Sequence, residues 1–313
     1  MKEDNRLDTI NWNITNRCNL RCKQCLFSSG NPSSGELKTE EALRIIKEAA
    51  DMKCSFIGFT GGEPLRRDDI FELLKFAKSL GIETGILTNG TLLNEKVISR
   101  LKNLGTDVKV SIDGMTEKIN DMLRGEGSFR KAMRGIRLLI RHDMLSGIYF
   151  TYNKVNKNQL PILFDFVRKN NVKNLKIAPL ILAGRAENSS ELLNLKEDDV
   201  KDIFKKIKAC AFGKRKDYIS YINDFCTAGM NTCQISSTGK VFPCINSQLK
   251  NFEVGDLRKK SLKYVWNNSV RLKRIREMRM GGEIKCRFVM IHVEGVSILY
   301  ESGYPCIASS FTR

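Results

Sequence analysis

The sequence contains only two histidines, His142 and His292, among its 313 residues. The sequence therefore offers few candidates for a catalytic histidine base. No uncharged apolar run approaches the roughly 20 residues that cross a bilayer, and the N-terminal residues contain no apolar core of a secretory signal. We accordingly predict a cytoplasmic protein with no membrane partner.

Cysteine, in contrast, is plentiful, with ten residues, and the formal net charge is +18. Structural disulfides are rare in a reducing compartment, so metal ligation or catalysis is the leading explanation for clustered thiols. The positive charge suits an acidic partner, such as a nucleic acid or an acidic peptide. A solvated lysine-rich surface explains the charge equally well.

Short β-branched runs alternate with amphipathic helical patterns from Thr9 to about Gly184. This alternation is typical of repeated βα units, which build a parallel sheet covered by helices. Right-handed crossovers would curl six strands into a partial (β/α)6 barrel, with an active site at the C-terminal strand ends. The predicted strands are Ile10–Thr15, Ser55–Thr60, Glu83–Thr88, Asp107–Ile112, Ile148–Asn153 and Asn174–Pro179. The predicted helices are Glu40–Met52, Asp68–Leu80, Glu95–Leu104, Phe129–His142 and Gln159–Lys169.

The pattern changes after a linker at Ala183–Ser190 and a helix near Asp198–Cys210. Short strands, glycine turns and dispersed cysteines follow, which indicate a small domain built around metal. We therefore predict an α/β fold in two domains: the partial barrel of parallel strands over residues 1–190, and a small cysteine-containing α+β domain over 191–313. Isolated Cys54 and Cys210 are predicted to be buried thiols.

The segment Trp12–Phe27 carries the pattern C-x-x-x-C-x-x-C directly after the first predicted strand. Its cysteines are Cys18, Cys22 and Cys25. Three thiolates in one loop can reach three corners of a single iron–sulfur cube, which leaves the fourth iron open to a small molecule. A zinc site would need a fourth ligand close by, and the next cysteine is far along the chain.

Together with motifs at the following strand ends, this loop resembles that of the radical S-adenosylmethionine (SAM) superfamily. Gly61-Gly62-Glu63-Pro64 resembles the family's GGE motif, which implies a contact with the amino group of SAM. Bare glycine backbone allows close approach, and a carboxylate suits an ammonium group. One departure is Gln24, since the family usually has an aromatic residue or histidine before the third cysteine. The resemblance further implies that Ser111 contacts SAM, that Asn89 lines the same cavity, that Ile177 and Ala178 contact adenine, and that Arg185 lies near the SAM carboxylate.

The resemblance implies two cofactors, a [4Fe–4S] cluster and SAM. In the family, one electron from the cluster splits SAM, and the resulting 5′-deoxyadenosyl radical abstracts hydrogen from a substrate. The cofactors supply the difficult chemistry, while the barrel orients the groups and excludes water. An electron donor such as ferredoxin or flavodoxin is an implied partner.

The C-terminal part resembles the SPASM extension of radical SAM peptide maturases. Cys226, Gly239 and Cys244 fit its C-x(9–15)-G-x(4)-C pattern, and Cys233 lies between them. The resemblance implies an auxiliary [4Fe–4S] cluster near the substrate, whereas structural zinc on the same cysteines is the competing interpretation. The family ends in about four closely spaced cysteines, but this chain offers only Cys286 and, much later, Cys306. We therefore predict one auxiliary cluster, with ligands among Cys226, Cys233, Cys244, Cys286 and Cys306.

Peptide maturation is the first functional hypothesis, because SPASM proteins characteristically modify ribosomal peptides or protein side chains. A basic surface suits an acidic leader peptide, and because the cysteine loop begins almost at once, we expect a separate protein to supply leader binding. Haem or tetrapyrrole side-chain modification is the second hypothesis. An iron–sulfur electron-transfer protein without SAM turnover is the third, and the GGEP motif argues against it. RNA modification has only the charge in its favour.

The sequence after Phe288 lacks the closing cysteines and shows no clear helical or strand pattern, so we predict an incomplete or divergent tail. One explanation is a lost base. Restoring one T at the Phe288–Val289 junction makes the next codon TGT, which encodes cysteine. The shifted reading frame then allows a sequence close to the family's closing group of cysteines. A genuinely divergent tail is the equal alternative. Resequencing the locus tests this prediction, and a Phe288 codon of TTC would contradict it.

Overall fold

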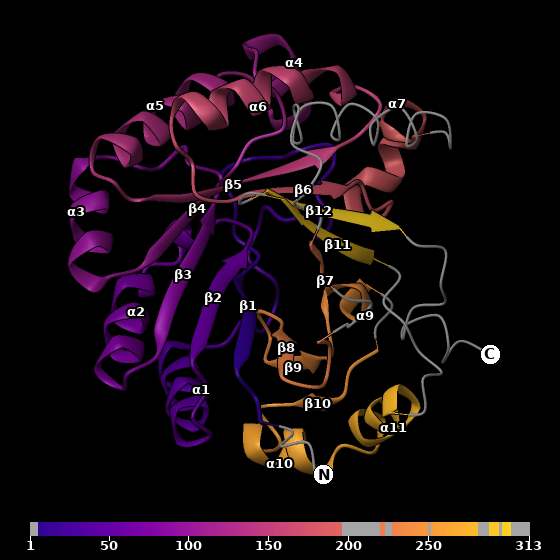
Figure 1. Ribbon diagram of the computed structural model, residues 1–313. Coiled ribbons are helices and arrows are strands. Elements are labelled where there is room, and N and C mark those ends of the chain that lie inside the picture. The colour runs from indigo at the N-terminus through magenta and orange to yellow at the C-terminus, as the bar shows by residue number, and fades with distance from the viewer. Residues whose placement is uncertain are drawn as a thin grey trace.

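The computed structural model describes residues 6–195, 220–222, 227–249, 252–280, 288–293 and 296–301. Six strands and the helices between them form the first part of the chain (Figure 1). The strands are β1 (Thr9–Thr15), β2 (Phe56–Gly61), β3 (Glu83–Thr88), β4 (Asp107–Ser111), β5 (Leu145–Tyr152) and β6 (Leu175–Pro179). The helices are α1 (Thr39–Asp51), α2 (Ile70–Ser79), α3 (Glu95–Leu104), α4 (Glu117–Arg124), α5 (Ser128–Arg141), α6 (Leu160–Lys169) and the short α7 (Ser190–Leu193).

Neighbouring strands from β1 to β6 are all parallel, in chain order. Helices cover the outer face of this curved sheet, and the sheet stays open (Figure 1). The predicted α/β class with a partial six-stranded barrel is therefore confirmed. Among the described residues, no helix is long and apolar enough to span a membrane.

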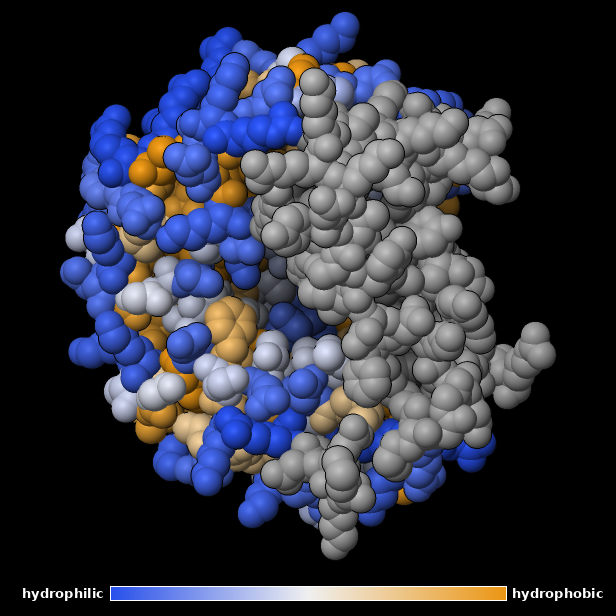
Figure 2. Space-filling view, viewed as in Figure 1, coloured by the Kyte–Doolittle hydropathy of each residue, from blue (hydrophilic) through white to orange (hydrophobic). Residues whose placement is uncertain are grey.

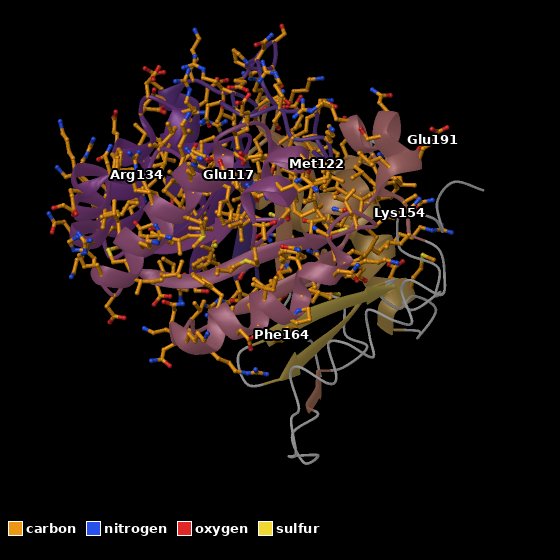
Figure 3. The ribbon with its side chains drawn as sticks, turned by 90° about the horizontal axis from the view of Figure 1, so that it is seen from above. Glu117, Met122, Arg134, Lys154, Phe164 and Glu191 are labelled. Carbon is orange, nitrogen blue, oxygen red and sulfur yellow. The ribbon has the colours of Figure 1, made fainter. Side chains whose placement is uncertain are left out.

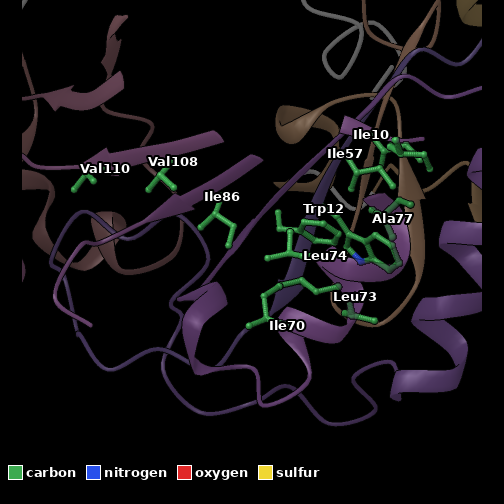
Figure 4. Packing of buried hydrophobic residues seen from close by; sticks show 14 of the residues in the cluster. Ile10, Trp12, Ile57, Ile70, Leu73, Leu74, Ala77, Ile86, Val108 and Val110 are labelled. Carbon is green, nitrogen blue, oxygen red and sulfur yellow. The ribbon is translucent and has the colours of Figure 1, made fainter. Parts of the chain in front are cut away.

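Side-chain alternation along β1 separates the hydrophobic core from the barrel interior. Trp12 is fully buried on the helix side, and its ring stacks on Phe59 of β2 with centroids 6.0 Å apart. Leu74 of α2 packs in the same cluster (Figure 4). Asn13 and Thr15 lie on the opposite face and are also buried. The inner surface of the barrel near β1 is therefore polar.

The C-terminal part joins both edges of the barrel sheet. Strand β8 (Thr232–Ile235) pairs with β1 in parallel, with Thr9 opposite Thr232. Strand β12 (Val296–Glu301) pairs with β6, and the described part of the chain contributes twelve strands to the sheet. The other C-terminal elements are β7 (Ser220–Ile222), β9 (Lys240–Phe242), α9 (Ile245–Leu249), β10 (Gly255–Asp256), α10 (Leu262–Asn268), α11 (Val270–Met280) and β11 (Phe288–Val293).

The tail departs from the sequence prediction. Strands β11 and β12 form an antiparallel hairpin, so the expectation of no strand pattern after Phe288 is wrong. Two β-branched runs separated by Glu294-Gly295 carry the hairpin signal. The hypothesis of a lost base stays a prediction, because a paired hairpin and a shifted reading frame are compatible. The predicted helix near Asp198–Cys210 lies outside the described residues.

The outer helices carry charged and apolar side chains. In Figure 3, seen from above, the labelled residues run from Arg134 of α5 at the left through Glu117 and Met122 of α4 to Glu191 of α7 at the right. Figure 2 keeps the direction of Figure 1 and shows a hollow near the middle of that face, with hydrophilic, intermediate and some hydrophobic residues along its described edge.

Candidate active site

The chain leaves β1 at Thr15 and forms a loop over residues 16–30, the cysteine loop. Its cysteines Cys18, Cys22 and Cys25 are all partly exposed. Backbone N–H groups point at two of the sulfurs: Leu20 donates to Cys18 Sγ at 3.4 Å, and Ser29 donates to Cys25 Sγ at 3.3 Å. Thiolates that bind iron accept such hydrogen bonds, so the loop fits a set of cluster ligands.

Among the residues the structure describes, no three Cys, His, Asp or Glu side chains lie close enough to hold a single metal ion. A [4Fe–4S] cluster makes a different demand, because each thiolate binds its own iron. Burial raises the pKa of Cys18, and it raises the pKa of Cys22 to about 12. Cys25 adds to both shifts, which places the three sulfurs within electrostatic reach of one another. Iron binding would replace these protons.

Two glycines let β2 end directly against the cysteine loop. A Cβ atom at Gly61 would lie 2.4 Å from Thr15 O, and one at Gly62 would lie 2.4 Å from Arg17 O. The φ of Gly61 is +121°, which side chains rarely allow. The Gly62 and Glu63 N–H groups donate to the same two carbonyls, at 2.8 and 2.9 Å. The Gly-Gly pair is therefore required by the protein's own backbone, and its predicted contact with SAM stays a prediction.

Glu63 is fully buried beside the cysteine loop. Its Oε2 accepts from Asn89 N at 2.7 Å, and its Oε1 accepts from Thr88 Oγ1 at 2.8 Å and from Leu65 N at 3.2 Å. Burial raises the pKa of Glu63, and these donors partly offset that effect. Pro64, the last residue of the motif, begins a 3-10 helix at Pro64–Arg66. The carboxylate thus ties the end of β2 to the end of β3.

Asn89 connects β3 to the cysteine loop. Its Nδ2 donates to Asn19 Oδ1 at 2.9 Å and lies 4.0 Å from Cys18 Sγ. The structure therefore brings Asn89 and Glu63 together beside Cys18, as the strand-end argument predicts. Ser111, at the end of β4, is half-buried and faces away from the core residue Val110.

A buried network that the sequence did not predict joins Gln24, Asp113 and Arg124; it is called the Asp113 network below. Asp113 Oδ2 accepts from Gln24 Nε2 at 2.5 Å and from Arg124 Nε at 2.7 Å. Burial opposes the charge of Arg124, but the Asp113 carboxylate outweighs it and raises the pKa of Arg124. The Arg124 carbonyl oxygen lies 4.0 Å from Cys22 Sγ, and Leu123 O accepts from Lys23 N at 2.8 Å. Helix α4 therefore anchors the middle of the cysteine loop.

Helix α4 was not among the predicted helices, although residues at both of its ends are typical of helix boundaries. Thr116 precedes it at a position typical of a helix N-cap, and Gly125 follows its last residue. Gln24, the departure from the family pattern, has its amide nitrogen committed to Asp113, while its Oε1 is buried without a partner. The Gln24 side chain therefore joins the cysteine loop to the segment that follows β4.

Arg185 lies at the cysteine loop, in a 3-10 helix over Gly184–Ser189. Its Nε donates to Cys22 O and its Nη1 donates to Ser29 O, both at 2.9 Å. Ala178 is half-buried, whereas Ile177 is fully buried in the hydrophobic core. Neighbouring strand residues point to opposite faces, so Ile177 and Ala178 face different sides of β6, and the adenine contact of Ile177 stays a prediction. The roles of Arg185 and Ala178 toward SAM stay predictions.

Comparison with known proteins decides the family. Residues 12–167 match the family model of the radical SAM superfamily, and residues 226–287 match the SPASM model, an iron-sulfur cluster-binding domain. An AdoMet-dependent heme synthase of Oleidesulfovibrio alaskensis is 30% identical over 297 residues, covering 83% of this chain and 74% of that protein. The chain belongs to the radical SAM superfamily. Mycofactocin maturase MftC of Mycobacterium tuberculosis is 28% identical over 288 residues, covering 87% and 73% of the two chains.

Solved structures share this radical SAM fold. Streptococcus suis SuiB bound to S-adenosylmethionine superposes with a TM-score of 0.71 at 20% identity, over 87% of this chain and 68% of SuiB. Membership in the superfamily and the match to the SPASM iron-sulfur model confirm the predicted cofactors: a [4Fe–4S] cluster, SAM and an auxiliary cluster.

The cysteines of the SPASM part lie in different surroundings. Cys244 is half-buried, and its Sγ lies 3.1 Å from Ser247 Oγ. Cys233 is fully buried, on the same face of β8 as Ile235 in the hydrophobic core. Burial raises the pKa of the Cys233 thiol, and Cys54 adds to the shift. The predicted ligand role of Cys233 stays a prediction. The predicted ligands Cys226, Cys286 and Cys306, and the predicted buried thiol Cys210, lie outside the described residues.

Proposed function

We propose that this radical SAM protein cleaves SAM reductively and uses the 5′-deoxyadenosyl radical to abstract hydrogen from a peptide or protein substrate. The observation that carries the proposal is the cysteine loop, where three thiols lie on one loop with N–H donors at two of the sulfurs. When bound there, a cluster supplies the electron that splits SAM into methionine and the radical.

The chain's own residues position these groups. We infer that Cys18, Cys22 and Cys25 hold the cluster and that the end of β2 presents SAM to it. Glu63 and Asn89 fix the ends of β2 and β3 beside Cys18, since Glu63 bonds the Asn89 N–H and Asn89 lies 4.0 Å from the sulfur. These hydrogen bonds hold the two strand ends rigid beside Cys18, where the methionine end of SAM would bind, and a rigid site favours a single reactive geometry.

A peptide or protein substrate is supported by two of the similar proteins. Mycofactocin maturase MftC is one, and SuiB, whose structure is also known bound to the precursor peptide SuiA, is the other. An acidic leader peptide, a separate leader-binding protein and a ferredoxin or flavodoxin remain proposed partners. The division into domains 1–190 and 191–313 is likewise proposed.

The second candidate is modification of a haem or tetrapyrrole side chain. The similarity to an AdoMet-dependent heme synthase, at 30% identity, favours it. The two candidates require different pockets. A tetrapyrrole carries several carboxylates that need cationic partners, whereas a peptide backbone needs neutral donors and acceptors.

Reconstituted protein reduced with dithionite is expected to convert SAM to 5′-deoxyadenosine under anaerobic conditions, because the open iron of the cluster activates SAM. Chromatography of the quenched reaction measures the product. Cys18→Ala should abolish it, whereas Cys54→Ala, which removes a thiol outside the cysteine loop, should retain it. Equal product from the wild type and Cys18→Ala would refute the proposed function.

Replacing Cys18, Cys22 and Cys25 together by alanine is expected to leave about half of the wild-type iron or less, because an auxiliary cluster remains in the SPASM part. Iron and acid-labile sulfide per folded chain are the measurements. A folded triple variant without iron would mean that the C-terminal cysteines bind zinc or no metal.

A further inference from the structure

A buried cation lies in the SPASM part, on helix α11. Arg276 is 6% exposed, and its helix neighbours Leu272 and Ile275 are fully buried. Arginine is almost never buried in a protein unless a carboxylate or another anion pairs with it, because removing the charge from water is costly. An anionic partner is therefore expected for Arg276.

The described contacts of Arg276 are with uncharged groups. Its Nε donates to Gly229 O at 2.8 Å, and its Nη1 donates to Trp266 O at 3.0 Å. The guanidinium carbon lies 4.5 Å from the centroid of the Trp266 ring. The remaining nitrogen, Nη2, is buried without a hydrogen-bond partner among the described residues. Burial lowers the pKa of Arg276 and no described carboxylate opposes that effect, so the charge is uncompensated within the described part of the chain.

Arg276 is held against the loop that leads into β8. Gly229, whose carbonyl accepts from Arg276, lies in that loop, between Cys226 and Cys233 in the sequence. A Cβ atom at Gly229 would lie 3.1 Å from Leu272 Cδ2, so α11 packs closely on the loop. The uncompensated charge is therefore next to the segment that carries two of the predicted ligands of the auxiliary cluster.

An iron–sulfur cluster with thiolate ligands fits this environment. Such a cluster carries a net negative charge, and reduction adds another negative charge. Arg276 Nη2 is itself covered, so no ligand atom reaches it from solvent. A charge in the protein interior nevertheless acts over several ångströms, because the low dielectric constant screens it weakly. A bound cluster would therefore stabilise the buried cation, and the cation would in turn favour the reduced cluster.

We propose that Arg276 is the charge-compensating residue of the auxiliary cluster and that it raises the reduction potential of that cluster. The inference goes beyond the proposed function, since it holds for a peptide and for a tetrapyrrole substrate alike. Removing the positive charge disfavours the added electron, so the potential should become more negative. A unit charge roughly 10 Å away, at an effective dielectric constant of about 20, changes the ratio of reduced to oxidised cluster about tenfold.

A redox titration followed by EPR spectroscopy tests the proposal. The parent is the reconstituted full-length chain with Cys18, Cys22 and Cys25 replaced by alanine, because its remaining cluster signal comes from the SPASM part. At the midpoint potential of the parent, Arg276→Gln is expected to lower the ratio of reduced to oxidised cluster about tenfold, a shift of about 59 mV to more negative potential for one electron. Arg276→Lys, which keeps the charge but not the fork of donors, should stay near the potential of the parent. The control Arg274→Gln removes an exposed charge from the same helix and should also leave the potential unchanged.

Auxiliary iron that is lost in Arg276→Gln and restored in Arg276→Lys would support the proposal as well, since the cluster would then need the charge to assemble. An unchanged potential in Arg276→Gln, an equal shift in Arg276→Lys, or a parent chain that binds no cluster would each overturn it. If Arg276→Gln does not fold, Arg276→Met takes its place, because the methionine side chain can pack on the Trp266 ring without a charge.

Discussion

Replacing Arg124 by glutamine is expected to lower the free energy of unfolding by about 3–5 kcal/mol, because the change leaves the Asp113 carboxylate buried without its cation. Asp113 is fully buried, and the Arg124 side chain is 11% exposed. The carboxylate would keep only neutral donors, from Gln24 and from the Thr151 N–H. Denaturant unfolding of the metal-free protein measures the change.

Arg130 supplies a matched control for this variant. It pairs with Glu117 at 2.9 Å, but its side chain is 79% exposed. Exposed pairs contribute about 0–1 kcal/mol, so Arg130→Gln should be nearly neutral. A second variant, Arg124→Gln with Asp113→Asn, should recover part of the loss because the isolated charge is removed. If Arg124→Gln is as mild as Arg130→Gln, the Asp113 network does not anchor the cysteine loop.

A methyl group at position 62 is expected to displace the cysteine loop and reduce bound iron to background. In Gly62→Ala the new Cβ atom would lie 2.4 Å from Arg17 O and 2.7 Å from Asn16 O, and both contacts are with backbone. Overpacking of this kind costs about 1–3 kcal/mol when the surroundings can shift. Here the shift must come from the segment that leads into Cys18. Iron per chain after reconstitution is the measurement.

Gly81→Ala separates this clash from ordinary backbone strain. Gly81 has a φ of +78°, but a Cβ atom there would meet nothing within 4 Å. We expect Gly81→Ala to lose about 1 kcal/mol of stability and no iron. Wild-type iron content in Gly62→Ala would show that the cysteine loop tolerates a displacement at its start.

Helix α3 shows why local elements were predicted well. Its predicted bounds, Glu95–Leu104, are those observed. Asn94 caps the first turn by accepting from Val97 N, and Gly105 ends the helix in the left-handed region. Both signals lie within one turn of the boundary, so the sequence carries them directly. Strand β3 likewise matches at both ends.

Long-range pairing was not predictable in the same way. No local pattern indicates that β8 adds to β1, since the choice depends on which sheet edge remains free after the barrel folds. The same pairing places Cys233 in the core, although its spacing from Cys226 and Cys244 indicated a metal ligand. The Asp113 network was not predicted for a related reason. Gln24 and Asp113 come into contact only when the end of β4 and the cysteine loop are adjacent.

The pairing of β1 with β8 has a consequence for synthesis on the ribosome. Thr9 emerges early, yet its partner Thr232 follows 223 positions later. At about 5–20 residues per second, the nascent β1 waits roughly 10–45 s for that neighbour. Its free edge, which carries Trp12, can meanwhile pair with another chain. Co-produced chaperones that cover this edge should therefore increase the yield of soluble protein more than a change of buffer after lysis.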